Sequence, residues 1–453
     1  MAANVLPVEL VELIFAHAAS SQSAVKSLRL ACRAFADIGF PYLFNPHFTH
    51  LSWRGDAQRL EKWSEHDRLR CHLRSWTLNL AQIDEYTGRH SSFFQYWAML
   101  PEERDAVLRE GWKEFYDKEA RRKAGGGFEK EGRGLVEAAG RLASLENLSV
   151  VFNECPYEND VLRRAFADPS SRRFEAHQVR ETFELLTRVL GQCSHLRKLE
   201  IDRLPMTMRP SVDAENVWGA FAGGIGRRLE EVRLALDFSG FVGGDLAGET
   251  YAGWGELVGV LLMDCWSVKR LEIAKHYYHP LEDRRRKTAR LNHLLLRDNA
   301  WRLTDLGLEG FATTEEELLG FVRRQATTLK RLRLGGRGVA NPREKSRGGI
   351  WLERGSWFGF FTGLRAEVRR ANGALQRLHL EGDFRQVEVV GVGEEGEGVV
   401  EKYDFYPTAD GDWEPVETPE WLRGRIAETA LDGRVFERYV LGDEDVAYPG
   451  FDL

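Results

Sequence analysis

Two histidines offer the first possibility of chemistry in this sequence. His276 and His279 are three residues apart, a spacing at which two imidazoles on one helical turn can bind the same metal ion. A protein zinc site needs three or four ligands, and Pro280 follows directly and disfavours a helix at this point. We therefore expect structural or exposed histidines here, and no metal.

A glycine-rich string offers the second possibility. Residues 391–396 match the G-x-G-x-x-G pattern of phosphate-binding loops and follow a predicted strand. Such a loop needs a helix N-terminus beside it and no opposing charge. Glu394, Glu395 and Glu397 would repel a pyrophosphate, and no helical pattern follows. The sequence therefore predicts a hairpin turn at this position and no nucleotide cofactor.

The other reactive residues are scattered. None of the cysteines forms a C-x-x-C pair, and their number is odd: Cys32, Cys71, Cys155, Cys193 and Cys265. This pattern argues against a disulfide framework and fits a reducing compartment, the cytoplasm or the nucleus. The basic run at 284–287 is compatible with a nuclear import signal, but the acidic residues Glu282 and Asp283 beside it favour a solvated loop. Because no G-x-S-x-G, H-E-x-x-H or Walker motif is present either, we predict no catalytic residue.

Composition narrows the choice of partners. The chain has 453 residues, with 63 Lys and Arg against 70 Asp and Glu, and so a net charge of −7. This mild acidity provides no basic footprint for nucleic acid. No apolar run approaches the ~18 residues of a membrane span. The first 20 residues contain Glu9 and Glu12 and no basic residue, which is not typical of a signal peptide. We expect neither nucleic acid nor a membrane as a partner.

The elements that would position a binding site begin with short helices. Apolar side chains at helical spacing predict a first helix just after Pro7, whose missing N–H suits a first helical turn. A serine-rich break at 20–23 precedes a second apolar series, and residues 34–38 predict a third helix that Pro41 ends. A unit of this size buries little surface by itself, so we expect it to pack on the rest of the chain or on a partner.

These first residues resemble an F-box of the fungal type. The resemblance rests on Leu6, Pro7, Glu9, Leu10 and Ile14, then Leu28, Cys32, Arg33 and Phe35, and last the Tyr42-Leu43-Phe44 segment. The sequence departs from the family pattern in having Phe35 where tryptophan is common, and serines where an acidic residue often lies. An F-box binds the small adaptor subunit of cullin-based ubiquitin ligases. The resemblance implies the following adaptor-binding residues: Leu6, Pro7, Leu10, Ile14, Leu28, Cys32 and Phe35.

A second pattern recurs through the rest of the chain. The string apolar-x-x-apolar-x-apolar occurs eight times, beginning at Leu73, Leu145, Leu196, Leu229, Val268, Leu303, Leu329 and Leu375. Its last three positions predict a short strand with one buried face, and the intervening residues are often charged. Helical patterns lie between the strands, for example at 179–190, after the Thr314-x-x-Glu317 capping box, and after Ser356.

Strands that alternate with helices are typical of leucine-rich-repeat solenoids. The spacing here is irregular, so the resemblance is to the degenerate leucine-rich arrays behind fungal F-boxes; an ordinary α/β domain with parallel strands is the alternative. We expect an α/β chain with a helical F-box at 1–46 and an irregular leucine-rich-repeat-like solenoid at 47–453. Aromatic residues 93–97 and the pattern at 107–115 predict a helical insertion packed on the first repeats. Loops are expected at 118–134 and 340–349, and a C-terminal hairpin and helix at 385–430.

Three functions fit this organisation. The first is a substrate receptor of a cullin-based (SCF-type) ubiquitin ligase, which binds the adaptor, and through it the cullin, by the F-box and holds a protein substrate on the solenoid. The second is an interaction scaffold outside a ligase. The third is an enzyme on an irregular α/β fold. The first two need the same apolar helical face at the N-terminus.

Overall fold

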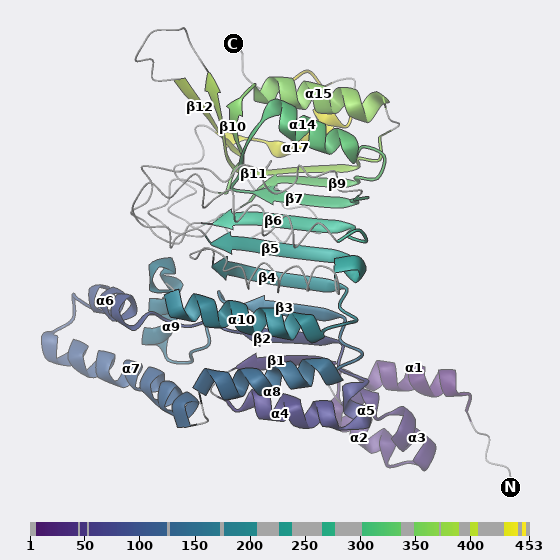
Figure 1. Cartoon of the computed structure of the whole chain (residues 1–453), viewed down its shortest axis with the longest axis vertical. Coiled ribbons are helices and arrows are strands. Elements are labelled where there is room, and N and C mark those ends of the chain that lie inside the picture. Colours follow the sequence, from purple (N-terminus) through teal and green to yellow (C-terminus); the bar gives the residue numbers. More distant parts are fainter. Residues whose placement is uncertain are drawn as a thin grey trace.

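The computed structural model describes residues 6–43, 46–51, 54–124, 127–172, 176–205, 226–237, 265–276, 301–336, 348–370, 373–388, 399–405, 430–442 and 446–449. The prediction of a mixed α/β chain with a large parallel sheet is confirmed (Figure 1). No helix in these ranges is both long enough and apolar enough to cross a bilayer.

The N-terminal helices form a small module at one end of the molecule (Figure 1). It contains α1 (Val8–Ala18), α2 (Gln22–Arg29), α3 (Arg33–Ile38) and the 3-10 turn η1 (Pro41–Leu43). Helix α1 packs on α2 and α3, and α2 also contacts η1. The three predicted helices are therefore present, with the breaks at the expected places.

The sheet runs through most of the molecule. Its main body contains β1 (His47–Leu51), β2 (Ser75–Asn79), β3 (Asn147–Val151), β4 (Lys198–Pro205), β5 (Glu231–Asp237), β6 (Arg270–His276), β7 (Asp305–Glu309), β9 (Arg331–Gly335) and β11 (Arg377–Glu388). These strands are parallel and lie side by side in chain order (Figure 1). Parallel strands can lie in chain order when each connection carries the chain back to the end of the sheet at which the strands begin.

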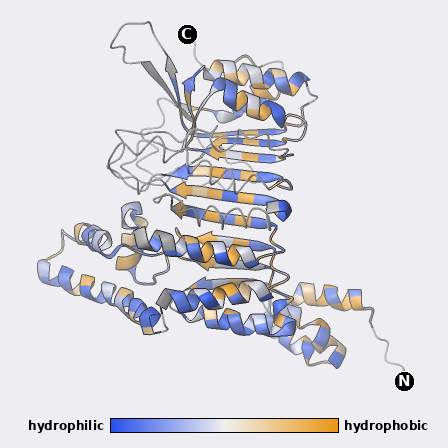
Figure 2. Ribbon diagram, in the orientation of Figure 1, coloured by the Kyte–Doolittle hydropathy of each residue, from blue (hydrophilic) through white to orange (hydrophobic). Residues whose placement is uncertain are grey.

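Each recurring apolar segment of the sequence supplies one strand of this sheet, and the segments pair in equivalent register. The middle apolar residue of every segment is the partner of the middle residue in the next strand: Trp76, Leu148, Leu199, Val232, Leu271, Leu306, Leu332 and Leu378. All of them are buried. Alternate residues point to opposite faces, which gives the strands their alternating hydropathy in Figure 2.

Helices cover the apolar face of the sheet. They are α4 (Asp56–Glu65), α8 (Gly127–Arg141), α10 (Ala176–Gln192), α14 (Glu315–Arg324) and α15 (Trp357–Arg370), whereas the short α5 (Asp67–Arg70) packs on α4. Their apolar side chains join those of the strands in one continuous core. The predicted capping box is confirmed at α14, where the Thr314 hydroxyl accepts the Glu317 N–H at 3.2 Å and the Glu317 carboxylate accepts the Thr314 N–H at 3.2 Å.

At the C-terminal end the sheet splits. Residues 377–381 of β11 pair with β9, and residues 382–388 pair with antiparallel β12 (Val399–Phe405). Gly382, at the change of partner, has a φ of +94°, which favours glycine. The other strands of this small sheet are β8 (Ala312–Thr314), β10 (Trp351–Arg354) and β13 (Ala430–Leu431), with α17 (Gly433–Val440) after them. Strands β11 and β12 pair antiparallel, as the predicted hairpin requires, whereas the residues between them and the region of the expected helix, 406–429, lie outside the described residues.

A helical insertion stands beside the N-terminal half of the sheet (Figure 1). It is built from α6 (Glu85–Gln95), α7 (Pro101–Ala124), α9 (Asp160–Ala167) and the turn η3 (Pro169–Arg172). These elements share a core separate from that of the sheet, with Trp112, Phe115, Leu162 and Phe166 among its members.

The expected loop at 118–134 is wrong, because helices α7 and α8 occupy all of it except residues 125–126. Charged residues of α7 support the helix by pairing along it: Glu114 forms an ion pair with Lys118, and both also bond the backbone of residues 156–159. In α8, Leu135 and Ala138 are buried in the sheet core. Of the second predicted loop, residues 340–347 lie outside the described residues.

Candidate interaction surfaces

Helix α1 begins directly after Pro7, its N-cap residue, as predicted. The Pro7 carbonyl accepts the N–H groups of Leu10 at 3.0 Å and Val11 at 3.2 Å, which starts the helical ladder. Val11 and Phe15 are buried, one turn apart on the side that meets the rest of the module. Leu10, on the other side, is exposed. Helix α1 therefore has apolar residues on two sides, and only one of these sides is used inside the module.

The core of the module is small. Its buried members are Val11, Phe15 and Val25. The Phe15 ring stacks on Tyr42 with centroids 5.6 Å apart, and meets Phe35 edge-on at 5.8 Å. Leu28 and Phe35, two of the predicted adaptor-binding residues, are half-buried and pack against this core. The structure therefore places both of them partly inside the module.

Cys32 has a local structural role. It occupies the N-cap position of α3, where its Sγ accepts the Phe35 N–H at 3.5 Å. Ser21 caps α2 in the same way, accepting the Ala24 N–H at 3.3 Å. A side-chain acceptor at this position satisfies one of the unpaired N–H groups of a helix start. The side chain of Cys32 is exposed, so it also lies on the module surface.

The remaining predicted residues are exposed: Leu6 and Pro7 directly before α1, and Leu10 and Ile14 on it. We define the α1 face as Leu6, Leu10, Leu13 and Ile14, whose side chains are 45%, 46%, 57% and 38% exposed. Leu10 lies three and four residues before Leu13 and Ile14, so these three share one side of the helix, and Leu6 directly precedes its N-cap, Pro7. Figure 2 shows the hydrophobic colouring of α1 at the edge of the molecule. The α1 face is an aliphatic surface that no described residue covers.

Leu30 is a further exposed apolar residue of the module, and the sequence prediction missed it. It follows α2 directly and is 88% exposed. Leu30 does not fit the helical spacing of Val25, Leu28 and Cys32. This mismatch could have indicated from the sequence that its side chain points away from the module core.

An aromatic side chain joins the module to the rest of the chain. Phe40 stacks on the His66 ring at 6.5 Å, and the Arg68 guanidinium lies 4.1 Å from the Phe40 ring centroid. Arg68 also forms an ion pair with Asp37 at 3.4 Å. These contacts fix the module against α5 and leave the α1 face outward.

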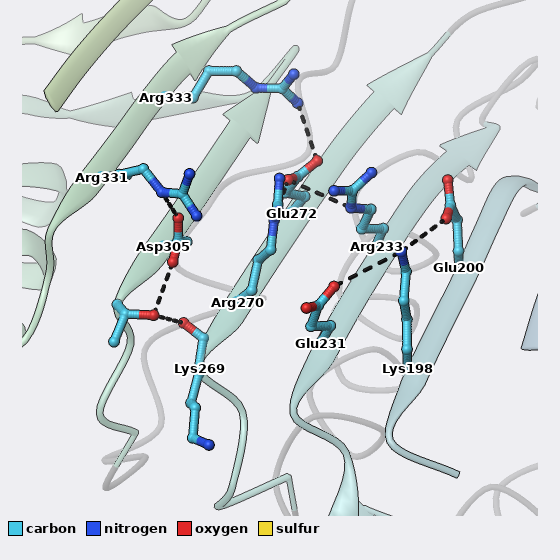
Figure 3. A network of polar contacts seen from close by, with 11 residues as sticks. Lys198, Glu200, Glu231, Arg233, Lys269, Arg270, Glu272, Asp305, Arg331 and Arg333 are labelled. Atoms are coloured by element: carbon cyan, nitrogen blue, oxygen red, sulfur yellow. Dashed lines mark hydrogen bonds and ion pairs between the residues drawn. The ribbon is translucent and has the colours of Figure 1, made fainter. Parts of the chain in front are cut away.

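The polar face of the sheet is a second candidate surface. Across the central strands, the first outward residues alternate in charge, and Figure 3 shows them as Lys198, Glu231, Arg270, Asp305 and Arg331. Lys198 lies 3.8 Å from Glu231, and Arg331 bonds Asp305 on the next strand. Opposite charges on adjacent strands stabilise a pairing, and like charges oppose it. The alternation therefore favours the observed strand order.

A second row of charges lies two residues further along the strands. Glu272 is its centre, 3.5 Å from Arg233, 2.9 Å from Arg270 and 3.7 Å from Arg333 (Figure 3). Arg333 reaches it across Gly307, where a side chain would press on both partners: a Cβ there would lie 3.0 Å from Glu272 Cγ and 3.4 Å from Arg333 Nε. The positive groups on this face thus have negative neighbours. The face therefore presents paired charges and is neither uniformly positive nor uniformly negative.

Where β4 and β5 end, the polar groups become buried. The Arg203 guanidinium donates to Asp237 at 2.8 Å, and both side chains are almost completely buried. Asp202 accepts the N–H groups of Phe152 at 2.7 Å and Asn153 at 3.0 Å. Burial raises the pKa of the Asp202 carboxyl to about 6 despite these bonds. Its oxygens are engaged by backbone, so it anchors the end of β3.

Two of the other residues that the sequence suggested for chemistry, His276 and Cys193, are paired or buried. His276 ends β6, and its Nε2 lies 3.1 Å from the Glu309 carboxylate. Burial raises the pKa of the Cys193 thiol to about 12, which keeps it protonated and unreactive. His279, residues 284–287 and the glycine string at 391–396 lie outside the described residues. Among the described residues, no group of three or more His, Cys, Asp or Glu could hold a metal ion.

Comparison with known proteins adds no relative. No protein-family model matches the chain, and no curated protein has a matching sequence.

Proposed function

We propose that this chain is the substrate-recognition subunit of a cullin-based ubiquitin ligase, with residues 1–46 as its F-box. The observation that carries the proposal is the α1 face, an uncovered aliphatic surface on the helix that begins with the Leu6-Pro7-x-Glu9-Leu10 motif. Fully burying one leucine side chain contributes ~1.5–3 kcal/mol, so a helix that exposes several of them gains by binding an apolar partner. The ligase adaptor is the partner that this motif implies.

The exposed members Leu6, Leu10, Leu13, Ile14 and Leu30 would make the direct contacts. Leu28 and Phe35 would instead hold α2 and α3 against α1, because they pack on the module core. Cys32 would fix the start of α3. The packing of α1 on the module's core would then determine which α1 side chains face the adaptor.

The parallel sheet would hold the protein substrate, as an irregular leucine-rich-repeat-like solenoid. Its polar face offers a row of paired side chains at fixed spacing, to which a folded or extended substrate can hydrogen-bond. No chemistry is required of this chain. Holding a substrate lysine near the ligase's E2 enzyme raises its effective concentration, and such proximity accelerates transfer.

The test is a pull-down of the full chain with the purified adaptor–cullin complex. The double variant Leu10→Glu/Ile14→Glu places two charges on the α1 face without touching Val11 or Phe15, and we expect it to lose binding. A matched control, Phe94→Glu/Trp97→Glu, places two charges on exposed aromatic positions of the helical insertion and should bind as the wild type does. Equal recovery of the wild type and the α1 variant would refute the assignment.

Ubiquitin transfer in the reconstituted ligase then separates a receptor from a scaffold. A receptor brings about transfer to a bound protein or to itself when E1, E2 and ubiquitin are present. A chain that binds the adaptor and supports no transfer would be an interaction scaffold.

A further inference from the structure

A groove between α6 and α7 lies on the helical insertion, away from the α1 face and the sheet. Its volume is about 850 Å³. Aromatic side chains from both helices line it, among them Tyr86 and Phe93 from α6 and Trp112 and Tyr116 from α7. We call it the aromatic groove.

The floor of the aromatic groove is rigid. Trp112 is buried and packs edge-on against Phe115 at 5.2 Å, within the separate core of the insertion. Gly88 lets α6 approach closely, because a Cβ there would lie 2.5 Å from Ile83 Cγ2 and 3.0 Å from the Trp112 ring. A groove built on packed helices is preformed, so a ligand need not order it on binding.

Large aromatic side chains are exposed on the walls and rim of the groove. Tyr86 is 82% exposed, and Phe93 is 42% exposed. Just beyond Phe93, Phe94, Trp97 and Leu100 are also largely exposed. Exposed large side chains gathered in this way mark interaction sites, since single surface hydrophobics are common and clusters are not.

Two cations on the groove wall have no partner among the residues that the structure describes. Arg109 and Lys113 lie one turn apart on α7, line the groove and are exposed. Neither makes an ion pair or a side-chain hydrogen bond with any residue that the structure describes. Arg89, by contrast, is held by Glu85 at 3.3 Å and lies over the Trp112 and Tyr116 rings. The groove therefore combines an aromatic floor with unneutralised positive charge.

We propose that the aromatic groove binds a short linear segment of another protein, one with apolar or aromatic side chains flanked by Asp or Glu. The apolar side chains would cover Tyr86 and Phe93, the exposed aromatic side chains of the groove. The acidic side chains would pair with Arg109 and Lys113, which are at hand for charge-assisted bonds. This binding goes beyond the adaptor contact and is independent of it, because the two surfaces share no residue.

A nucleic acid fits the groove less well than a peptide. Base stacking needs open aromatic faces, but Arg89 lies over Trp112 and Tyr116, and Arg104 lies 4.3 Å from the Phe93 ring centroid.

The test is selection of a phage-displayed random peptide library on the immobilised full chain. We expect enriched peptides to combine aromatic or leucine residues with Asp and Glu. One of them, made with a fluorescent label, should bind the wild type in solution and bind Arg109→Glu/Lys113→Glu at least about tenfold more weakly. Both substituted residues are exposed, and Arg121→Glu/Lys123→Glu makes the same change at the end of the same helix, outside the groove. That control should bind as the wild type does.

Three results would overturn the assignment. The first is an absence of enriched peptides, and the second is equal binding of the selected peptide by the wild type and Arg109→Glu/Lys113→Glu. The third is binding of a labelled single-stranded oligothymidylate that this variant abolishes, which would assign the groove to nucleic acid. None of these results bears on adaptor binding, which is measured separately with the α1 variant.

Discussion

The α1 face and the aromatic groove are both exposed apolar surfaces on helices, but they are built differently. The α1 face is aliphatic and lies on a module whose core has three buried residues. The groove is aromatic, carries Arg109 and Lys113, and lies on a core of nine buried residues. The two surfaces therefore differ both in the side chains that they expose and in the size of the core beneath them.

This difference teaches what each surface can recognise. An aliphatic face without unpaired cations suits another apolar surface, and its affinity comes from area removed from water. An aromatic groove with free positive charge suits a segment of defined chemistry, because charge placement discriminates between partners. The small core beneath α1 also makes that face the more sensitive of the two to a loss of packing.

The largest expected effect is the loss of stability when a buried aromatic ring is removed from either core. Phe15→Ala and Trp112→Ala each remove a buried aromatic ring, at a cost of about 3–5 kcal/mol. Phe15 is one of three buried residues in its core, so we expect its loss to unfold residues 8–43 locally and abolish adaptor binding. Trp112→Ala leaves most of its core in place, and α7 should stay helical. Hydrogen exchange measures both outcomes by region.

The effect of Phe15→Ala should be confined to the module. Exchange in β2 to β4 should match the wild type, since the sheet core does not include Phe15. If the Phe15→Ala module stayed protected from hydrogen exchange and still bound the adaptor, the claim that the α1 face depends on this small core would be wrong.

A matched glycine pair gives an intermediate effect. A methyl group on Gly39 would overlap the Phe15 ring, and one on Gly88 would press on Ile83 and Trp112. Overpacking of this kind costs typically about 1–3 kcal/mol. We expect Gly39→Ala to weaken adaptor binding and spare peptide binding at the groove, and Gly88→Ala to do the reverse. Parallel titrations of both variants with both ligands decide this, and a variant that weakens both ligands equally would contradict the separation.

Salt gives the smallest expected effect and tests the charge difference alone. The Debye length falls from ~10 Å at about 0.1 M salt to ~3 Å at 1 M, so charge pairing at Arg109 and Lys113 is screened. Peptide binding at the groove should weaken by about threefold to tenfold over this range, and adaptor binding by less than about twofold. Anisotropy titrations at several salt concentrations measure both, and an adaptor affinity that fell more steeply than the peptide affinity would reverse the comparison.

Much of the sheet could be predicted because a parallel strand with one buried face leaves a short, strict pattern. Strand β1 escaped the prediction because its buried positions are Phe48 and His50, and the imidazole of His50 takes the place of an aliphatic residue by bonding Glu131 at 2.8 Å. The α7–α8 region was misread because its charges and glycines outweighed a helical apolar spacing that only tertiary packing makes decisive.

The interaction surfaces were harder to predict. Helical spacing on α1 is satisfied twice, by Val11 and Phe15 and by Leu6, Leu10 and Ile14, and sequence does not say which side the module buries. Residues 93–97 and 107–115 were expected to form a helical insertion packed on the first repeats. Most of these residues are helical, but Trp112 and Phe115 belong to a core separate from that of the sheet, and Phe94 and Trp97 are exposed. The groove joins two helices, and no single-helix pattern encodes it.

The most direct test of the central claim is a hydrogen-exchange footprint of the adaptor on the full wild-type chain. If α1 binds the adaptor, exchange should slow in residues 8–18 and around Leu30 when the adaptor is added, and should stay unchanged in α6 and α7. Unchanged exchange in α1 at saturating adaptor, or slowing at α6 and α7 instead, would contradict the account.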